Sequence, residues 1–233
     1  MVDLIMLAAP FGVFALLCAL VSEAPSLDLF QALGMYSVTV VVGLIGVICF
    51  YLILIKFFTG KSPKFFIKGI APAQLLAFST SSSAATLPVT MERVTEHLGV
   101  HKEVASFVLP IGATVNMDGT SLYQAVAAVF IAQAFGMDLS LSAQLGIIVT
   151  ATLASIGSAA VPGAGMVMLV IVLAQAGIPE AGLALIFAVD RPLDMCRTVV
   201  NVTGDAVVAM VIANSEGLLG EPRVVNWDDT YKK

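Results

Sequence analysis

Four apolar runs dominate this chain, and each is about as long as a bilayer-spanning helix or longer. They cover residues 1–21, 36–58, 104–135 and 183–213, whereas about 20 apolar residues in a helix cross the hydrocarbon core. Hydrophobic residues make up 59% of the sequence and charged residues only 12%, about half the share in a soluble domain. Gly, Ala and Ser are frequent inside the runs, as close packing of helices in lipid requires. The sequence therefore predicts an all-α protein that crosses the membrane several times.

The placement of Lys and Arg predicts the orientation of the chain in the membrane. Basic residues gather after the second run, before the third and at the C-terminus: Lys56, Lys61, Lys64, Lys68, Arg93, Lys102, Arg223, Lys232 and Lys233. The loops at 22–31, 136–142 and 177–180 contain no Lys or Arg but do carry acids. Because cytoplasmic loops are enriched in basic residues, we expect the basic segments, including a tail at 217–233, on the cytoplasmic side of the plasma membrane.

Two segments conflict with a simple topology because both of their ends fall on the same side. Residues 65–98 begin and end near cytoplasmic charges, yet their centre is STSSSAATLP and neither apolar arm is long enough to cross. Residues 143–177 have both ends outside and SIGSAAVPGAG at the centre. We expect each segment to be a re-entrant helical hairpin, with Pro88 interrupting the helix of the first. Irregular backbone at that depth must be buried in protein or line a cavity.

The two hairpin centres resemble each other, since both run from Ser through two Ala to Pro. Each hairpin precedes a long helix with polar residues in its middle, expected at 103–135 and 182–215. Insertion from opposite sides makes this arrangement an inverted repeat, and transporter sites lie where such repeats meet, near the midplane. A simpler interpretation is that each small-residue segment is only a face for tight helix packing.

The last apolar run carries a stripe of polar residues. Asp190, Asp194, Arg197, Asn201 and Asp205 fall within an arc of about 80° on a helix. An ionisable group at the bilayer centre costs at least about 2.5 kcal/mol, so these groups must pair, bind a ligand or line water. They could include a purely structural ion pair between Asp194 and Arg197 that locks two helices together. The favoured interpretation is that Arg197 binds a carboxylate and Asp194 an ammonium group.

The motif NMDGT, residues 116–120, supplies hard oxygen donors within the third run. Asn116 and Asp118 offer such oxygens, and Gly119 is expected to mark backbone that departs from helix geometry. Freed carbonyls beside carboxylates coordinate alkali cations at membrane depth, and neutral donors also surround Asp205. These residues favour Na⁺; the alternative is that Asp118 carries a proton, another common role of an intramembrane acid.

Four motifs in order, SSSAATLP, NMDGT, SIGSAAVPGAG and DMCRTVVNVTGD, resemble those of the dicarboxylate/amino acid:cation symporter family, which includes archaeal aspartate and mammalian glutamate transporters. The resemblance extends over nearly the whole chain. It implies a secondary active transporter rather than an enzyme, which takes up glutamate or aspartate with Na⁺. It implies that the protein lies in a plasma membrane, in a bacterium the inner membrane, where lipid surrounds it. It implies no nucleic-acid partner. Further implications are a homotrimer of the full-length protein and a transport domain that moves like an elevator.

The resemblance also assigns roles to individual residues. Arg197 would bind the side-chain carboxylate of the substrate and Asp194 its amino group. Further substrate contacts would come from Ser82, Ser83, Thr120, Val161, Gly165, Thr198 and Asn201. One Na⁺ would lie between Gly112, Asn116, Asn201 and Asp205. A second would lie near Thr114, Met117, Ser155, Ile156 and Ser158, and a third at Asn116 and Asp118.

The same resemblance divides the chain into parts. Residues 1–23 would be a residual scaffold helix, and residues 35–216 a transport domain followed by the tail. That domain would comprise a helix at 35–58, the hairpin at 65–98, a broken helix at 103–135, the hairpin at 143–177 and an amphipathic helix at 182–215. Because the family's opening helices have no counterpart, we expect a fragment of a longer chain, and such a fragment could be inactive.

Particular residues argue against two competing functions. A proton-coupled C4-dicarboxylate symporter of the same fold is disfavoured by Asp194, because succinate has no amino group to bind there. An intramembrane aspartyl protease is disfavoured by Val202, where its motif needs Gly.

Relatives carry an additional Arg where this sequence has Ser81 or Met195. The hypothesis that follows is that Arg191 partly supplies this charge.

Overall fold

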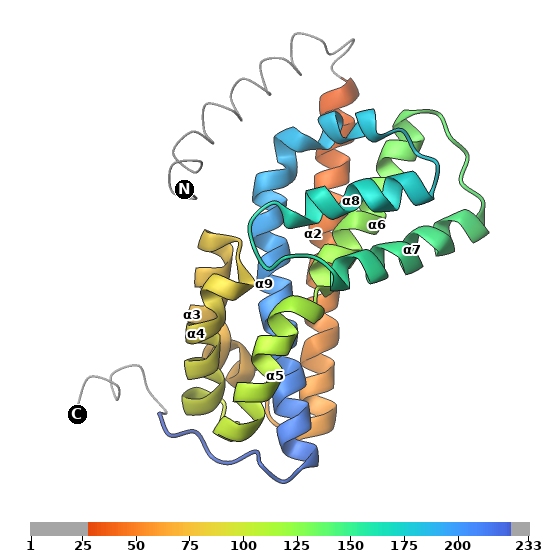
Figure 1. Ribbon diagram of the computed structural model, residues 1–233. Coiled ribbons are helices and arrows are strands. Elements are labelled where there is room, and N and C mark those ends of the chain that lie inside the picture. The colour runs from red at the N-terminus through yellow and green to blue at the C-terminus, as the bar shows by residue number, and fades with distance from the viewer. Residues whose placement is uncertain (1–27, 225–233) are drawn as a thin grey trace.

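The structure, a computed structural model, describes residues 28–224, and every regular element in this range is a helix. The predicted scaffold helix at 1–23 lies outside the described residues. A long helix, α2 (Asp28–Leu54), continues as the short π-helix η1 (Ile55–Thr59). Another long helix, α9 (Leu183–Ser215), follows the single turn η3 (Glu180–Gly182) and runs through the middle of the molecule (Figure 1).

Two pairs of shorter helices flank α9. The first pair is α3 (Pro63–Thr80) and α4 (Ser83–Glu92), the latter continuing as η2 (Arg93–His97); the second is α7 (Leu141–Ile156) and α8 (Ala164–Gln175). The helices of each pair contact each other. Their connecting turns, residues 81–82 (the first tip) and 157–163 (the second tip), both lie beside the middle of α9 (Figure 1).

Between the pairs, the chain forms a helix that is broken in its middle. α5 (Lys102–Val115) ends where Asn116 and Met117 leave helical geometry, with φ/ψ of −86°/84° and −116°/46°, and α6 (Asp118–Ala134) begins directly afterwards. The expectation that Gly119 marks the break is wrong, because Gly119 lies inside α6. A Cβ at Gly119 would collide with α9, so this glycine allows a close approach of the two helices.

The first tip also differs from the sequence expectation. α4 runs through Pro88 without interruption, and the chain reverses earlier, at Ser81, which adopts a left-handed conformation with φ of 51°. Ser82 then starts α4, because its hydroxyl accepts a hydrogen bond from the N–H of Ala85 (3.1 Å). Such a cap stabilises a helix start by about 1 kcal/mol, so the break lies at the cap and not at the proline.

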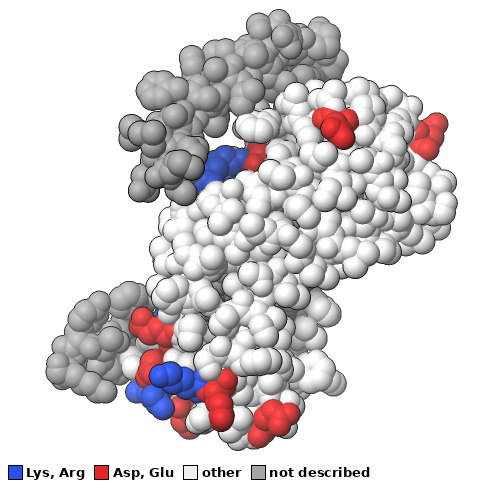
Figure 2. All heavy atoms as spheres, in the orientation of Figure 1, with Lys and Arg blue, Asp and Glu red and all other residues white. Residues whose placement is uncertain are grey.

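Two of the described helical segments are long and apolar enough to cross a membrane, Phe30–Thr59 and Glu180–Ser215. The first turns large apolar side chains outward: Met35, Val42 and Phe57 are between 62% and 79% exposed. The second is mostly buried by the helices around it. On the face drawn in Figure 2, charged side chains gather toward the two ends of the described part and leave an uncharged band between them. This distribution matches a bilayer, whose apolar core lies between two polar surfaces.

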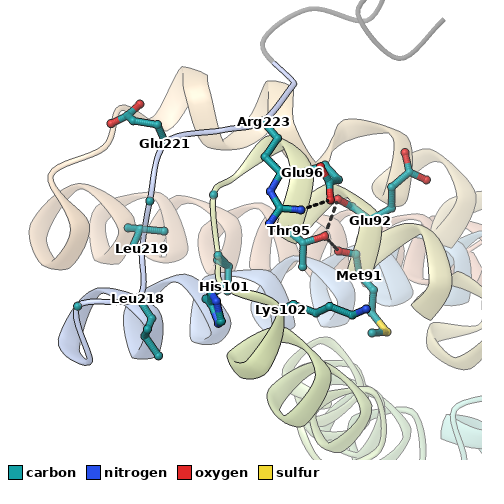
Figure 3. A pocket seen from close by; sticks show the side chains of 14 residues that line it. Met91, Glu92, Thr95, Glu96, His101, Lys102, Leu218, Leu219, Glu221 and Arg223 are labelled. Atoms are coloured by element: carbon teal, nitrogen blue, oxygen red, sulfur yellow. Dashed lines mark hydrogen bonds and ion pairs between the residues drawn. The ribbon is translucent and has the colours of Figure 1, made fainter. Parts of the chain in front are cut away.

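After α9 the chain turns back along the end of the first helix pair (Figure 3). We call residues 217–224 the C-terminal strap. The N–H of Gly220 donates to the carbonyl of Gly99 (2.8 Å), and the N–H of Arg223 donates to the carbonyl of Glu96 (2.9 Å). The Arg223 guanidinium also bonds to the Glu96 carboxylate (3.3 Å). The strap and the turn between η2 and α5 line a pocket of about 590 Å³.

Candidate binding site between the tips and α9

The two tips contact each other beside α9. The hydroxyl of Ser82 donates to the carbonyl of Ala160 in the second tip (2.7 Å), and the N–H of Ala84 points to the same carbonyl (3.4 Å). The neighbouring Ser81 combines a strained backbone with a buried hydroxyl that has no hydrogen-bond partner among residues 28–224. Strain of this kind concentrates at ligand sites.

Asp194 on α9 is held by groups from two elements. Its Oδ1 accepts from Nη2 of Arg197 at 2.5 Å, and its Oδ2 accepts from the N–H of Gly163 in the second tip at 2.9 Å. The Thr198 hydroxyl donates to the Asp194 carbonyl (2.9 Å). Asp194 and Arg197 are 3% and 2% exposed, and buried charges of this kind require pairing. The ion pair that the sequence allowed between these two residues is therefore present.

The bond to Asp194 uses Nη2 of Arg197 and leaves the other terminal nitrogen, Nη1, available. Its Nη1 is buried and, within the described part of the chain, has no hydrogen-bond partner, which is rare for a buried polar group. The guanidinium carbon lies 4.5 Å from the centre of the Tyr123 ring, a cation–π arrangement that supports the charge. Gly165 of α8 lies so close that a Cβ there would collide with the guanidinium. A guanidinium fork held on an aromatic face is suited to bind a carboxylate.

Asn201, one turn further along α9, connects the stripe to the break between α5 and α6. Its Oδ1 accepts from the N–H of Gly119 (2.8 Å), and its Nδ2 donates to the hydroxyl of Thr120 (3.1 Å). The Met117 sulfur lies 3.2 Å from the same Nδ2. Because both amide hydrogens have acceptors, a ligand that binds Nδ2 would replace one of them.

A small cavity joins these groups. It offers about 20 Å³ to the centres of water-sized molecules, which is room for about one water. All residues predicted to bind the substrate line it except Ser82, and the lining also includes Ser81, Met117, Ser158 and Ala160. The structure thus gathers residues from both tips, α6, α8 and α9 around one point.

A second polar cluster lies further along α9, where Asp205 faces the broken helix. Nδ2 of Asn116 donates to Oδ1 of Asp205 (3.0 Å), and a Cβ on Gly112 would collide with that oxygen. The Tyr51 hydroxyl of α2 donates to Asp118, an exposed acid at the start of α6. Asp205 is 3% exposed and has no ion-pair partner in the described range. A buried carboxylate in this setting suits a bound cation or a proton.

The structure does not bring all the residues predicted for the second Na⁺ together around one point. Met117 and Ser158 line the cavity between the tips, whereas Thr114 and Ile156 are exposed. The Ser155 carbonyl accepts from the N–H of Ser158 (3.0 Å). This ion site therefore stays a prediction.

Comparison with known proteins identifies the family to which this site belongs. Residues 1–215 match the profile of the sodium:dicarboxylate symporter family. The chain belongs to this family. Similar members include human excitatory amino acid transporter 5, which is 48% identical over 207 residues, covering 88% of this chain and 37% of that protein. Excitatory amino acid transporter 3 of Oryctolagus cuniculus is 50% identical over 206 residues (88% and 39%), and an excitatory amino acid transporter of Caenorhabditis elegans is 47% identical over 210 residues (89% and 42%). The chain spans roughly two fifths of the length of these curated relatives.

Two side chains of this sodium:dicarboxylate symporter family member were missed by the sequence prediction. Tyr123 lies beneath Arg197 and donates to Asp190 (2.7 Å), while Nε2 of Gln124 donates to the carbonyl of Gly165 (3.0 Å). Both follow the predicted Thr120 by three and four residues. Because side chains at this spacing share one helix face, helical periodicity after the NMDGT motif is the signal that would have found them.

Proposed function

We propose that this protein is the substrate- and ion-binding part of a secondary active transporter that takes up acidic amino acids together with Na⁺. The observation that carries the proposal is Nη1 of Arg197, which is buried in the lining of a cavity and lacks a partner among residues 28–224. A carboxylate supplies the acceptor that this nitrogen needs. The family description and the names of the relatives agree with that chemistry.

An acidic amino acid has two carboxylates and one ammonium group, and the site offers a counterpart for each. The side-chain carboxylate would bind Arg197, and the ammonium would bind Oδ2 of Asp194 in place of the Gly163 N–H. The other carboxylate would lie at the start of α4 and α8, since both helices begin beside the cavity and helix N-termini favour anions. The remaining contacts would come from backbone at Ser82, Ser83, Val161 and Gly165 and from the side chains of Thr120, Thr198 and Asn201.

Binding would require the tips to separate, because room for about one water does not admit an amino acid. The contacts between Ser82 and Ala160 and between Gly163 and Asp194 would break. We assign the moving role to the second tip, as the outer gate. Its connection is longer than the first tip, and Gly163 already has a φ of 78° that other residues rarely adopt.

Na⁺ would be cargo that neutralises Asp205 and Asp118. Asp205, with Asn116, Gly112 and a reoriented Asn201, would bind one ion, and Asp118 with Asn116 would bind another. Carbonyls near Thr114, Met117, Ser155, Ile156 and Ser158 would bind a further ion. Oxygen donors are the ligands that hard cations prefer. Protonation of Asp205 or Asp118 would remove the same charge, so proton coupling is the alternative that an experiment must separate.

The architecture we propose follows from the two helix pairs on α9. They would be re-entrant hairpins of a transport domain at 35–216 that moves like an elevator, with residues 1–23 as part of the scaffold. The domain would work in a homotrimer of the full-length protein, surrounded by lipid in the plasma membrane, which in a bacterium is the inner membrane. The tail at 217–233 would be cytoplasmic, because its described part, the strap at 217–224, contacts the basic end of the first pair.

The first test is equilibrium binding of aspartate to the purified chain at increasing Na⁺ concentration. Binding that strengthens with Na⁺ and is lost in Arg197→Lys, which keeps the charge but not the fork, would support the site. Tm measured for both proteins shows whether the variant is folded. Sodium-independent binding, or equal affinity for succinate and aspartate, would contradict the proposed substrate and ion.

The second test is uptake of labelled aspartate into proteoliposomes under either a Na⁺ or a proton gradient of the same size. The proposal expects accumulation driven by Na⁺. Accumulation that follows only the proton gradient would overturn the coupling ion. Binding without any uptake would limit the function of this chain to binding.

A further inference from the structure

Asp194 lies between two guanidinium groups, and only one of them belongs to the site described above. Arg197 contacts Oδ1 at 2.5 Å, while Nη1 of Arg191 lies 3.8 Å from Oδ2. That second oxygen also accepts the hydrogen bond from the N–H of Gly163 in the second tip. Arg191 therefore acts on the oxygen to which the substrate ammonium would bind.

Arg191 and Arg197 differ in how deeply they are buried. The side chain of Arg191 is 34% exposed and that of Arg197 is 3% exposed. Arg191 is not among the residues that line the cavity. The distance of 3.8 Å between Nη1 of Arg191 and Oδ2 of Asp194 is at the long end for an ion pair, so Arg191 acts on Asp194 mainly through its charge.

With Asp190 and Asp194 both ionised, the charges around this point balance only if Arg191 is counted. The two acids would then contribute two negative charges, against one positive charge each from Arg197 and Arg191. Asp190 accepts a hydrogen bond from Tyr123 and forms no ion pair within 4 Å in the described residues. Without Arg191, this part of α9 would hold one net negative charge. An acidic amino acid is itself a net anion and would be repelled by it.

We propose that Arg191 is a positioning residue that balances Asp194 and thereby raises the affinity of the site for an anionic amino acid. This proposal rests on the proposed function, because it assumes that aspartate binds at Arg197. It assigns a role in ligand affinity to a partly exposed residue outside the cavity, and it predicts that the charge at position 191 matters more than the shape of the side chain.

The test compares aspartate Kd values, at fixed Na⁺, for the wild type, Arg191→Gln and Arg191→Lys. A matched control is Arg223→Gln, which removes an arginine that is ion-paired to Glu96 at the strap. We expect the Kd to rise about fivefold in Arg191→Gln, the upper range for a partly exposed ion pair, and to recover in Arg191→Lys. The control should bind aspartate like the wild type.

Ionic strength separates an electrostatic role from a structural one. Because salt screens partly exposed charges, the difference between Arg191→Gln and wild type should shrink when choline chloride is added. An unchanged Kd in Arg191→Gln, a difference that does not depend on salt, or no recovery in Arg191→Lys would each overturn the proposal. If the wild type itself fails to bind aspartate, the proposed function fails instead, so the two failures are distinguishable.

Discussion

The hydroxyl of Ser82 in the first tip donates a hydrogen bond of 2.7 Å to the carbonyl of Ala160 in the second tip. The two residues are far apart in the sequence, and each belongs to a different helix pair. Ala160 also belongs to the lining of the cavity that Arg197 and Asp194 line from α9. The contact between the tips therefore lies at the edge of the proposed binding site.

Ser82→Ala should loosen the closed site. The change removes the bond to Ala160 and also the cap of α4, which costs about 1 kcal/mol of stability. We expect aspartate to dissociate faster, as measured by dilution of bound label. Ser62→Ala is the matched control, because Ser62 caps α3 in the same way but lies at the other end of that helix. Similar dissociation rates in both variants would show that the contact between the tips does not hold the ligand.

Gly165→Ala should displace Arg197. A Cβ at this position would collide with the guanidinium, and misplacing a buried charge that binds a ligand costs about 2 kcal/mol or more. We expect the aspartate Kd to rise at least about thirtyfold. Gly146→Ala in α7 is the control, since nothing lies within 4 Å of its added Cβ and Ala favours a helix over Gly. Equal affinity in the two variants would mean that Arg197 does not bind the substrate.

Gly112→Ala should impair the ion cluster more than the substrate site. The added Cβ would meet the Asp205 carboxylate, and Asp205→Asn would remove its charge. For both variants we expect the Na⁺ concentration that gives half-maximal aspartate binding to rise about tenfold, as for loss of a bond to a charged group. Asp138→Asn, in the loop between α6 and α7, is the control. A Na⁺ dependence that stays the same in Asp205→Asn would exclude Asp205 as an ion ligand.

Stability should depend on pH through His97, which lies at the end of the first helix pair. Burial and the neighbouring Arg93 lower the pKa of His97, against weaker opposing effects of Glu92 and Glu96. Nη1 of Arg93 lies 2.5 Å from Nε2 of His97, so the ring accepts a hydrogen bond and must be neutral there. The unfolded state therefore binds the proton more readily, and stability is complete above about pH 6.5 and decreases as the pH falls below it.

The measurement is Tm between pH 5 and pH 8 for the wild type and two variants. His97→Gln should lose most of the decrease in Tm below about pH 6.5, whereas His101→Gln, in an exposed position, should keep it. The same pH profile in His97→Gln and wild type would assign the effect to another group.

Local patterns made the helical fold and the stripe on α9 predictable. The length of an apolar run sets the length of a membrane helix, and helical periodicity places Asp194, Arg197 and Asn201 on one face. The same reasoning misplaced the break at Gly119 and the interruption at Pro88. A glycine signals either flexibility or close contact, and a single sequence does not distinguish the two.

Long-range contacts were beyond prediction from the residues alone. Nothing local indicates that Ser82 touches Ala160, that Tyr123 lies under Arg197 or that Gly163 donates to Asp194. These contacts depend on how separate helices pack, and the polar side chains involved have several equally good partners in the sequence. Residues that act through such contacts are therefore found from structure.

One uninterrupted helix, α9, carries both polar clusters, from Asp194 to Asp205. At about 1.5 Å per residue, the two acids are separated by about 16 Å along the helix axis. Neither cluster can shift along that axis without the other, so an amino acid and a cation bound at these places would travel as one load. In the transporter that we propose, the ratio of Na⁺ to amino acid would then be set before movement, by the combinations of bound charges with which the tips can close.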